Sequence, residues 1–165
     1  MGTIKLSNVS KRYGDTFALD NISLTIESNK IYGILGRNGA GKTTLLNVIN
    51  NRIFADNGVI SIDGKNLSEN KNALGNIYFM AEKNLYPQAM RVKHLFKWSK
   101  EFYPKFDMEY AIELSKKFEL NINKRINELS TGYSSICKII NTMASGVEIL
   151  MFDEPVLGLD ASHRE

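Results

Sequence analysis

The sequence has little cysteine, little proline and no long apolar run. Its 165 residues include one cysteine and three prolines. Because Cys137 has no second cysteine to pair with, an internal disulfide is excluded, which fits a reducing compartment. The first 15 residues lack the apolar core of a signal peptide. No stretch approaches the roughly 18 apolar residues that span a bilayer, so we expect a soluble chain that reaches a membrane only through a partner.

The sequence also lacks a large excess of basic or acidic residues. The 21 basic and 18 acidic side chains give a net charge of +3. This balance is too even to indicate a nucleic-acid surface, so no nucleic-acid partner is expected. Residues 83–100 are locally basic and aromatic, and we interpret them as a solvated helix face with a few core anchors. The length predicts one domain with a core of its own.

Glycine is concentrated where the chain carries its clearest motif. Residues 36–43 read GRNGAGKT and match the phosphate-binding pattern G-x-x-x-x-G-K-[ST]. The apolar run 31–35 predicts a buried strand before the loop, and residues 43–50 predict a helix after it. Glycines let backbone N–H groups turn toward phosphate oxygens, and the helix N-terminus adds positive potential. The residues expected to contact a nucleotide here are Gly36, Arg37, Asn38, Gly39, Ala40, Gly41, Lys42, Thr43 and Thr44.

Two residues of this loop have specific expected roles. Lys42 is expected to reach the β- and γ-phosphates and to act in catalysis. The Thr43 hydroxyl is expected to ligate magnesium. The alternative is an ordinary glycine-rich turn between a strand and a helix.

A second motif supplies the carboxylates that the loop lacks. Residues 147–152 form a nearly continuous apolar run, typical of a buried parallel strand, and Asp153 and Glu154 follow at its carboxyl end. We expect Asp153 to hold the magnesium shell and Glu154 to be the general base for the water that attacks the γ-phosphate. A strand that merely stops at charged residues before Pro155 is the alternative. Together the two motifs predict binding and hydrolysis of a nucleoside triphosphate.

The remaining pattern predicts an α/β chain of mixed architecture. Apolar and polar residues alternate in 4–10, 17–27 and 58–64, as in antiparallel strands with one exposed face. Three runs lack that alternation and predict the strands of a parallel core: 31–35, 76–81 and 147–152.

Between residues 80 and 148 the spacing of apolar residues becomes helical. Pro104 separates the first two predicted helices, and Asp107 is a candidate N-cap for the second. The apolar positions with this spacing are Val92, Leu95, Phe96 and Phe102, then Met108, Ala111, Ile112 and Phe118, then Ile136, Ile139, Ile140, Met143 and Ala144. The expected organisation is one domain, 1–165, with a nucleotide-binding core at 1–80 and 146–165 and a helical subdomain at 81–145.

The order of these motifs resembles the ATP-binding subunit of an ATP-binding cassette (ABC) transporter over essentially the whole chain. The specific evidence is LSTGY at 129–133, which is similar to the family signature LSGGQ and stands shortly before the carboxylate strand. The chain has Thr131 and Tyr133 where the family has glycine and glutamine. The resemblance implies the α/β P-loop NTPase fold of an ABC cassette, with a mainly parallel core sheet, an antiparallel β subdomain and a helical subdomain. It also implies ATP and Mg²⁺ as cofactors.

The resemblance gives roles to residues outside the two main motifs. Ser130 and Gly132 would meet the γ-phosphate bound to a second ATPase subunit in a head-to-tail homo- or heterodimer, with a plain helix cap as the alternative. Tyr13 would stack on adenine, unless it is only a tyrosine at an exposed strand edge. Asp160 would lie in the loop that touches the partner's active site. Glu82 stands where the family has glutamine, and we expect it to contact the magnesium shell and to take part in catalysis.

A histidine of the family has no counterpart at the expected place. The family carries it on a strand well beyond the loop of Asp160, whereas this sequence ends at Glu165. His163 is too close to that loop to serve, and His94 is interpreted as a helix-surface residue. We therefore expect a truncated chain that binds ATP weakly and hydrolyses it poorly.

The predicted function is that of an ATPase subunit that powers a membrane exporter. Residues 102–132 are similar to ATPase subunits of bacterial exporters of peptides, toxins or antibiotics, with a phenol-soluble modulin exporter as one candidate. The expected partners are integral membrane permease subunits, which Tyr86 and Trp98 are hypothesised to face, at the cytoplasmic face of the plasma membrane. The alternatives are a soluble ABC ATPase acting on ribosomes or DNA, and a non-hydrolysing nucleotide-dependent regulatory module.

Overall fold

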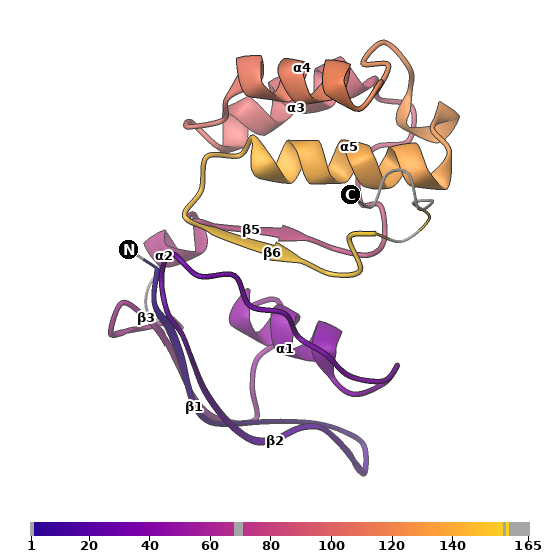
Figure 1. The fold of residues 1–165 in the computed structure, drawn as a ribbon. Helices are drawn as coiled ribbons and strands as arrows, with labels where there is room; N and C mark the ends of the chain where they lie inside the picture. The colour runs from indigo at the N-terminus through magenta and orange to yellow at the C-terminus, as the bar shows by residue number, and fades with distance from the viewer. Residues whose placement is uncertain (1, 68–70, 157, 159–165) are drawn as a thin grey trace. The chain divides into compact units, whose positions relative to one another are not determined.

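The computed structural model describes residues 2–67, 71–156 and 158, which Figure 1 traces. The chain forms two compact units, Met1–Ile77 and Tyr78–Glu165, which we call unit 1 and unit 2. The domain boundaries expected from the sequence, with a helical subdomain at 81–145, stay a prediction.

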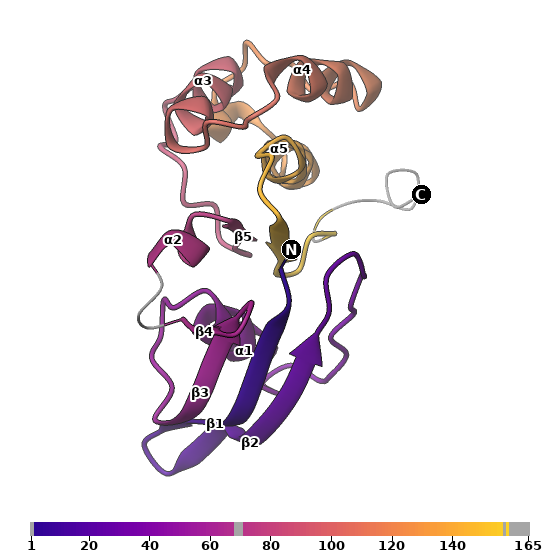
Figure 2. The ribbon, with the colours of Figure 1, turned by 90° about the vertical axis from the view of Figure 1, so that its left-hand side faces the viewer.

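Unit 1 is built on an antiparallel sheet. Its strands are β1 (Ile4–Tyr13), β2 (Thr16–Ile26), β3 (Asn57–Ile62) and β4 (Lys65–Asn66). They lie in the order β2-β1-β3-β4, and each neighbouring pair is antiparallel (Figure 2). The antiparallel strands predicted from alternating residues are therefore confirmed.

One face of this sheet carries the core of unit 1. Ile4 and Leu6 on β1 are buried while Lys5 between them is exposed, as the two-residue period of a strand requires. On β3, Ile60 and Ile62 are likewise buried, with the half-buried Ser61 between them. The predicted helix after the loop is α1 (Lys42–Ile49), which packs against β2 and buries Leu45, Leu46, Val48 and Ile49. A single turn, α2 (Lys71–Leu74), comes late in the unit.

The apolar run 31–35 is not a strand in this structure. It has no regular secondary structure, and Ile31 and Leu35 are 103% and 96% exposed. The prediction of a buried strand is therefore wrong here, because an apolar run becomes a strand only when a neighbouring strand supplies backbone partners. Among the described residues, 31–35 belongs to neither sheet, so no strand supplies such partners to it.

Unit 2 combines a strand pair with helices. β5 (Ile77–Met80), which begins at the unit boundary, pairs with β6 (Ile149–Phe152), and Figure 1 shows both running in the same direction. Between them in sequence come α3 (Val92–Phe102), α4 (Met108–Lys117), the 3-10 turn η1 (Ile126–Glu128) and α5 (Thr131–Met143). Parallel neighbours need such a long crossover. None of the helices in the described ranges is long and apolar enough to cross a membrane.

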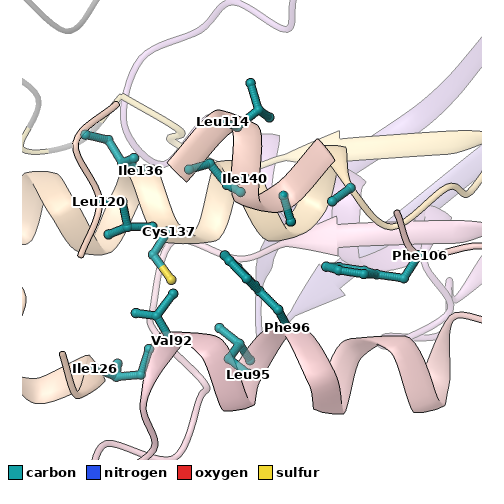
Figure 3. Close-up of a cluster of buried hydrophobic side chains, with 12 residues drawn as sticks. Val92, Leu95, Phe96, Phe106, Leu114, Leu120, Ile126, Ile136, Cys137 and Ile140 are labelled. Atoms are coloured by element: carbon teal, nitrogen blue, oxygen red, sulfur yellow. The ribbon is translucent and has the colours of Figure 1, made fainter. Parts of the chain in front are cut away.

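Helix α5 is central to unit 2. It lies between the β5–β6 pair and the helices α3 and α4 (Figure 1 and Figure 2). Buried side chains fill the space between the three helices (Figure 3); they are Val92, Leu95, Phe96, Phe106, Ala111, Leu114, Leu120, Ile126, Ile136, Cys137, Ile140 and Ala144. Burial raises the pKa of the Cys137 thiol to about 12, so this cysteine is a protonated core residue.

The helical spacing of the sequence predicted most of this core. Three predicted positions differ: Phe102 and Met143 are exposed, and Ile112 lies outside the core cluster. The spacing did not single out five members of the core, which are Phe106, Leu114, Leu120, Ile126 and Cys137. Pro104 lies between α3 and α4, as predicted. Asp107 caps α4, because its Oδ1 accepts a hydrogen bond from the Tyr110 N–H at 2.9 Å.

Candidate functional site

The phosphate loop of unit 1 has glycine where the backbone leaves the usual region. Gly39 and Gly41 have φ of +84° and +87°, a left-handed conformation that other residues rarely adopt. Gly41 also lies against β2, since a Cβ added there would be 2.2 Å from the carbonyl oxygen of Ala18. The Ala40 N–H donates to the Arg37 carbonyl at 3.1 Å and closes the turn. Both backbone angle and space therefore require glycine at Gly41.

Lys42 begins α1, and its ammonium turns back over the loop. Its Nζ donates to the carbonyls of Gly36 at 2.9 Å and Arg37 at 3.1 Å. Thr43 is exposed and Thr44 is half-buried in the first turn of the helix. A cation and the positive end of a helix thus border one loop, and this combination suits phosphate. The other loop residues, Gly36, Arg37, Asn38, Gly39 and Ala40, are all exposed.

An aromatic and basic cluster lies near the turn of the β1–β2 hairpin. Tyr13 ends β1 and is 49% exposed, with the Lys11 ammonium 5.7 Å from its ring centre. The Arg12 guanidinium lies 5.2 Å from the ring centre of Phe17, which is also exposed. An exposed aromatic ring can stack on a base. The adenine-stacking role of Tyr13 stays a prediction.

The two carboxylates of unit 2 follow β6. Asp153 is buried, and its N–H donates to the Met80 carbonyl of β5 at 2.9 Å. Glu154 is exposed and has φ of +50°, an uncommon conformation for a residue with a side chain. Such outliers are concentrated at functional sites. The adjacent carboxylates therefore occupy different environments, as two different roles would require.

Glu82 lies just past the end of β5, beside α5. Its side chain is exposed, whereas its carbonyl oxygen accepts a hydrogen bond from the Lys138 ammonium at 2.7 Å. Lys138 is 7% exposed and also donates to the Ala81 carbonyl at 3.1 Å. Burial lowers the pKa of Lys138, and the negative charges of Glu82 and Asp153 oppose that shift. The sequence did not single out Lys138, because a lysine in a helix usually marks the solvent face.

Ser130 is the N-cap of α5, and its expected contact with a γ-phosphate stays a prediction. Its Oγ accepts a hydrogen bond from the Tyr133 N–H at 3.3 Å, and Gly132 lies in the first turn of the helix. Thr131, one of the departures from the family signature, packs against Gly158, where a Cβ would lie 2.6 Å from the Thr131 Cγ2. A hydroxyl, backbone amides and the positive end of a helix thus come together at this point.

Each unit by itself carries oxygen donors of the kind that magnesium prefers. Asp153 and Glu82 offer carboxylates in unit 2, and Thr43 offers a hydroxyl in unit 1; Mg²⁺ prefers such hard oxygen ligands. Among the described residues, no group of three or more His, Cys, Asp or Glu could hold a metal ion by itself. This composition suits an ion held by one or two carboxylates together with nucleotide phosphates rather than by an all-protein cage.

The two aromatic residues predicted to face a membrane subunit differ in this structure. Trp98 is 43% exposed on α3 and packs edge-on against Phe102, with 5.3 Å between ring centres. The Tyr86 hydroxyl instead lies inside unit 2, 3.1 Å from the Tyr78 hydroxyl and 3.3 Å from Asn141 Nδ2. Burial raises the pKa of Tyr86 well above its ordinary value. The hydroxyl of Tyr86 is thus used internally, contrary to the hypothesis that this residue faces a partner.

Three further residues carried expectations from the sequence. His94 is exposed on α3, as predicted. Asp160 and His163 lie outside the described residues, so the roles expected for them stay predictions.

Comparison with known proteins decides the family. The sequence profile of the ABC transporter family matches residues 19–157. The chain belongs to this family. It is an ABC transporter ATP-binding domain, and the predicted α/β P-loop NTPase cassette fold is confirmed.

Curated relatives include ATP-binding proteins with different names. The ABC transporter ATP-binding protein YtrB of Bacillus subtilis is 38% identical over 161 residues, which are 98% of this chain and 55% of YtrB. The ribose import ATP-binding protein RbsA of Lactococcus lactis is 31% identical over 175 residues, covering 98% of this chain and 35% of RbsA. The chain therefore spans about half the length, or less, of these relatives.

A solved relative gives the structural comparison. It is an ATP-binding cassette determined as a dimer in a post-hydrolysis state, bound to ADP and Pi. Its TM-score with this ABC domain is 0.82 at 25% sequence identity, over 96% of this chain and 77% of the relative. The cassette fold thus extends over nearly all of this ABC domain.

Proposed function

We propose that this ABC domain is the ATP-hydrolysing subunit of a membrane exporter and acts as a dimer at the cytoplasmic face of the plasma membrane. One observation carries the proposal: three groups suited to ATP stand at the ends of secondary-structure elements. They are the phosphate loop before α1, the carboxylates after β6 and the Ser130 cap of α5. Each group supplies a different part of ATP chemistry.

ATP binding would begin at the loop of unit 1. The Lys42 ammonium, which bonds to the carbonyls of Gly36 and Arg37, would turn to the β- and γ-phosphate oxygens. The exposed Thr43 hydroxyl would ligate Mg²⁺, and the exposed Tyr13 ring would stack on adenine. Mg²⁺ would neutralise developing charge on the phosphates when bound.

Hydrolysis would depend on the residues that follow β6 and β5. Asp153, whose backbone is hydrogen-bonded to Met80, would hold the magnesium shell with Glu82. The Glu154 side chain is exposed and can meet a water molecule, so it would accept the proton of the attacking water as general base. The buried Asp153 would thus serve the metal, and the exposed Glu154 would serve the attacking water.

A second ATPase subunit would complete the site. Ser130 and Gly132 of one subunit would contact the γ-phosphate held by the other, because a hydroxyl and the positive end of α5 come together there. Asp160 of each subunit would lie near the partner's active site. The relative that was determined as a dimer bound to ADP and Pi supports the proposal of a dimer.

Membrane subunits would supply the transport path. The exposed Trp98 and Phe102 on α3 form an edge-on aromatic pair that could bury against a permease subunit. Export of peptides, amphipathic toxins or antibiotics is proposed from the resemblance of residues 102–132 to exporter subunits. The ribose-import name of one relative belongs to that protein.

The test uses this protein expressed and purified together with the products of its neighbouring genes, to ask whether a membrane subunit co-purifies. Glu154→Gln is expected to reduce ATP turnover about 10²- to 10⁴-fold by removing the general base, and to accumulate an ATP-bound dimer visible by light scattering. Glu148→Gln, an exposed residue just before β6, is the matched control and should leave turnover unchanged. Transport is measured as ATP-dependent movement of a labelled amphipathic peptide in proteoliposomes.

Three results would replace the proposal. ATP binding without turnover in the wild-type protein would favour the non-hydrolysing regulatory module. Co-purification with ribosomes or DNA, and with no membrane subunit, would favour a soluble ABC ATPase. Peptide movement that does not depend on ATP would remove the exporter assignment.

A further inference from the structure

A buried lysine joins α5 to the segment that follows β5. Lys138 is 7% exposed, and its Nζ donates to the carbonyl oxygens of Ala81 at 3.1 Å and Glu82 at 2.7 Å. Removing an ammonium from water is unfavourable unless hydrogen bonds compensate. Two such bonds to consecutive carbonyls therefore fix the backbone at this point.

The carbonyl before these two is also engaged. Met80 accepts a hydrogen bond from the Asp153 N–H at 2.9 Å. The carbonyls of residues 80, 81 and 82 are thus held in turn by the end of β6 and by Lys138. These hydrogen bonds therefore fix the backbone of Glu82 relative to that of Asp153.

The same face of α5 holds the residues that come next. Ser134 accepts a hydrogen bond from Asn84 Nδ2 at 3.1 Å, and Asn141 donates to the Tyr86 hydroxyl at 3.3 Å. Ser134, Lys138 and Asn141 are four and three residues apart, so they lie on one helix face. A continuous polar face of α5 therefore supports the segment 81–86.

We propose that Lys138 is a positioning residue for the Mg²⁺ of bound ATP and that it acts through the backbone of Glu82. The inference rests on the proposed function, because it deepens the role of Glu82 in binding Mg-ATP. The Lys138 ammonium donates hydrogen bonds to the backbone carbonyls of Ala81 and Glu82. It fixes the backbone from which the Glu82 side chain extends. Its positive charge also interacts with the carboxylates of Glu82 and Asp153.

The test measures metal binding separately from turnover. The affinity for a fluorescent ATP analogue is measured in EDTA and in Mg²⁺, and the ratio of the two affinities reports the metal contribution. Lys138→Met is expected to lower this ratio about 10-fold or more, as loss of a residue that orients a metal ligand does, with the affinity in EDTA unchanged. Lys116→Met, at an exposed position of α4, is the matched control and should keep the wild-type ratio.

A double variant separates positioning from general support of the fold. In a Glu82→Ala background, Lys138→Met should have no further effect on the ratio, because the group it positions is absent. Hydrogen exchange of residues 81–86 should rise in Lys138→Met while that of α3 stays as in the wild-type protein. If Lys138→Met does not fold, Lys138→Gln, which keeps a neutral donor, should show a smaller loss of the ratio.

Three outcomes overturn the inference. They are a wild-type ratio in Lys138→Met or Lys138→Gln, a lysine effect that persists without the Glu82 carboxylate, and a loss of affinity that is equal in EDTA and Mg²⁺. If the wild-type protein binds no nucleotide in either buffer, the proposed function fails and this inference fails with it.

Discussion

The two units hold their candidate functional groups in different ways. In unit 1 the phosphate loop is made of exposed residues, and its shape comes from the backbone conformation at Gly41 and from the Lys42 bonds to loop carbonyls. In unit 2, Asp153 and Ser130 stand at the ends of elements that are packed around a buried core. Groups that bind phosphate through backbone amides need mainly local chain geometry, whereas side chains that act on metal or water need tertiary packing to place them.

The greatest loss of stability should come from a substitution that disrupts the backbone geometry of unit 1. Gly41→Ala places a Cβ 2.2 Å from the Ala18 carbonyl oxygen and puts an L side chain at φ +87°. We expect a loss of about 3 kcal/mol or more in the free energy of unfolding, together with weaker ATP binding. Gly64→Ala is the matched control, because Gly64 has φ +77° with open space around it, and it should cost about 1 kcal/mol. Equal losses in urea unfolding would show that the contact with Ala18 is irrelevant.

A smaller effect tests the tertiary support of unit 2. Asn141 is fully buried; its Nδ2 donates to the Tyr78 hydroxyl at 2.6 Å, and its Oδ1 accepts from Ser99 Oγ at 2.8 Å. Asn141→Leu keeps the volume but leaves buried hydroxyls without these partners, so it should lower the free energy of unfolding by about 2 kcal/mol. Asn123→Leu, at an exposed position, should change it by less than about 0.5 kcal/mol. If chemical denaturation gives the same free energy of unfolding for Asn141→Leu and the wild-type protein, packing alone maintains unit 2.

Two helix caps sharpen the comparison within unit 2. Ser130 caps α5 and Asp107 caps α4, with oxygen to N–H distances of 3.3 Å and 2.9 Å. Each alanine variant should lower thermal stability by an amount equivalent to about 1 kcal/mol, with the smaller loss for Ser130→Ala because of its longer bond. Only Ser130→Ala should also reduce ATP turnover, since only this hydroxyl is proposed to meet a γ-phosphate. Equal turnover in the two variants would leave Ser130 as a plain helix cap.

The smallest effect is a pH dependence in unit 1. The Lys11 ammonium donates to Asp56 at 2.6 Å, and this hydrogen bond lowers the pKa of the carboxyl below its ordinary value of 3.8. The charged pair therefore stabilises unit 1 fully above pH 3.8, and the stabilisation is lost as the pH falls through the lowered pKa. Acidification should lower the free energy of unfolding, measured in urea, more for the wild-type protein than for the Asp56→Asn variant. Parallel pH profiles for the two proteins would assign no stability to this pair.

The sequence predicted those parts of the fold that depend on local pattern. Alternating residues identified β1 and β3, helical spacing identified the core positions of α3, and Asp107 was recognised as a cap. It also placed Asp153 and Glu154 at a strand end, where β6 indeed finishes. These features depend on the side-chain period and on hydrogen bonds within a few residues, so they can be read from one segment at a time.

Features that depend on distant partners could not be predicted in this way. Residues 31–35 read as a buried strand, but a run of apolar letters does not show whether a neighbouring strand will pair with it. Lys138 and Asn141 read as polar helix positions, and only the fold brings carbonyls and hydroxyls to them. The same limit hid the internal hydrogen bonds of Tyr86, which made this residue look available to a partner.

The most direct test of the central claim is calorimetric titration of ATP with Mg²⁺ into the wild-type chain and into Lys42→Ala. The account predicts saturable binding to the wild-type chain and an affinity lower by about 10- to 100-fold in the variant, because a hydrogen bond from a charged group contributes about 1.5–3 kcal/mol. The variant should unfold at the wild-type temperature. Equal affinity in the two proteins, or no binding by the wild-type chain, would contradict the account.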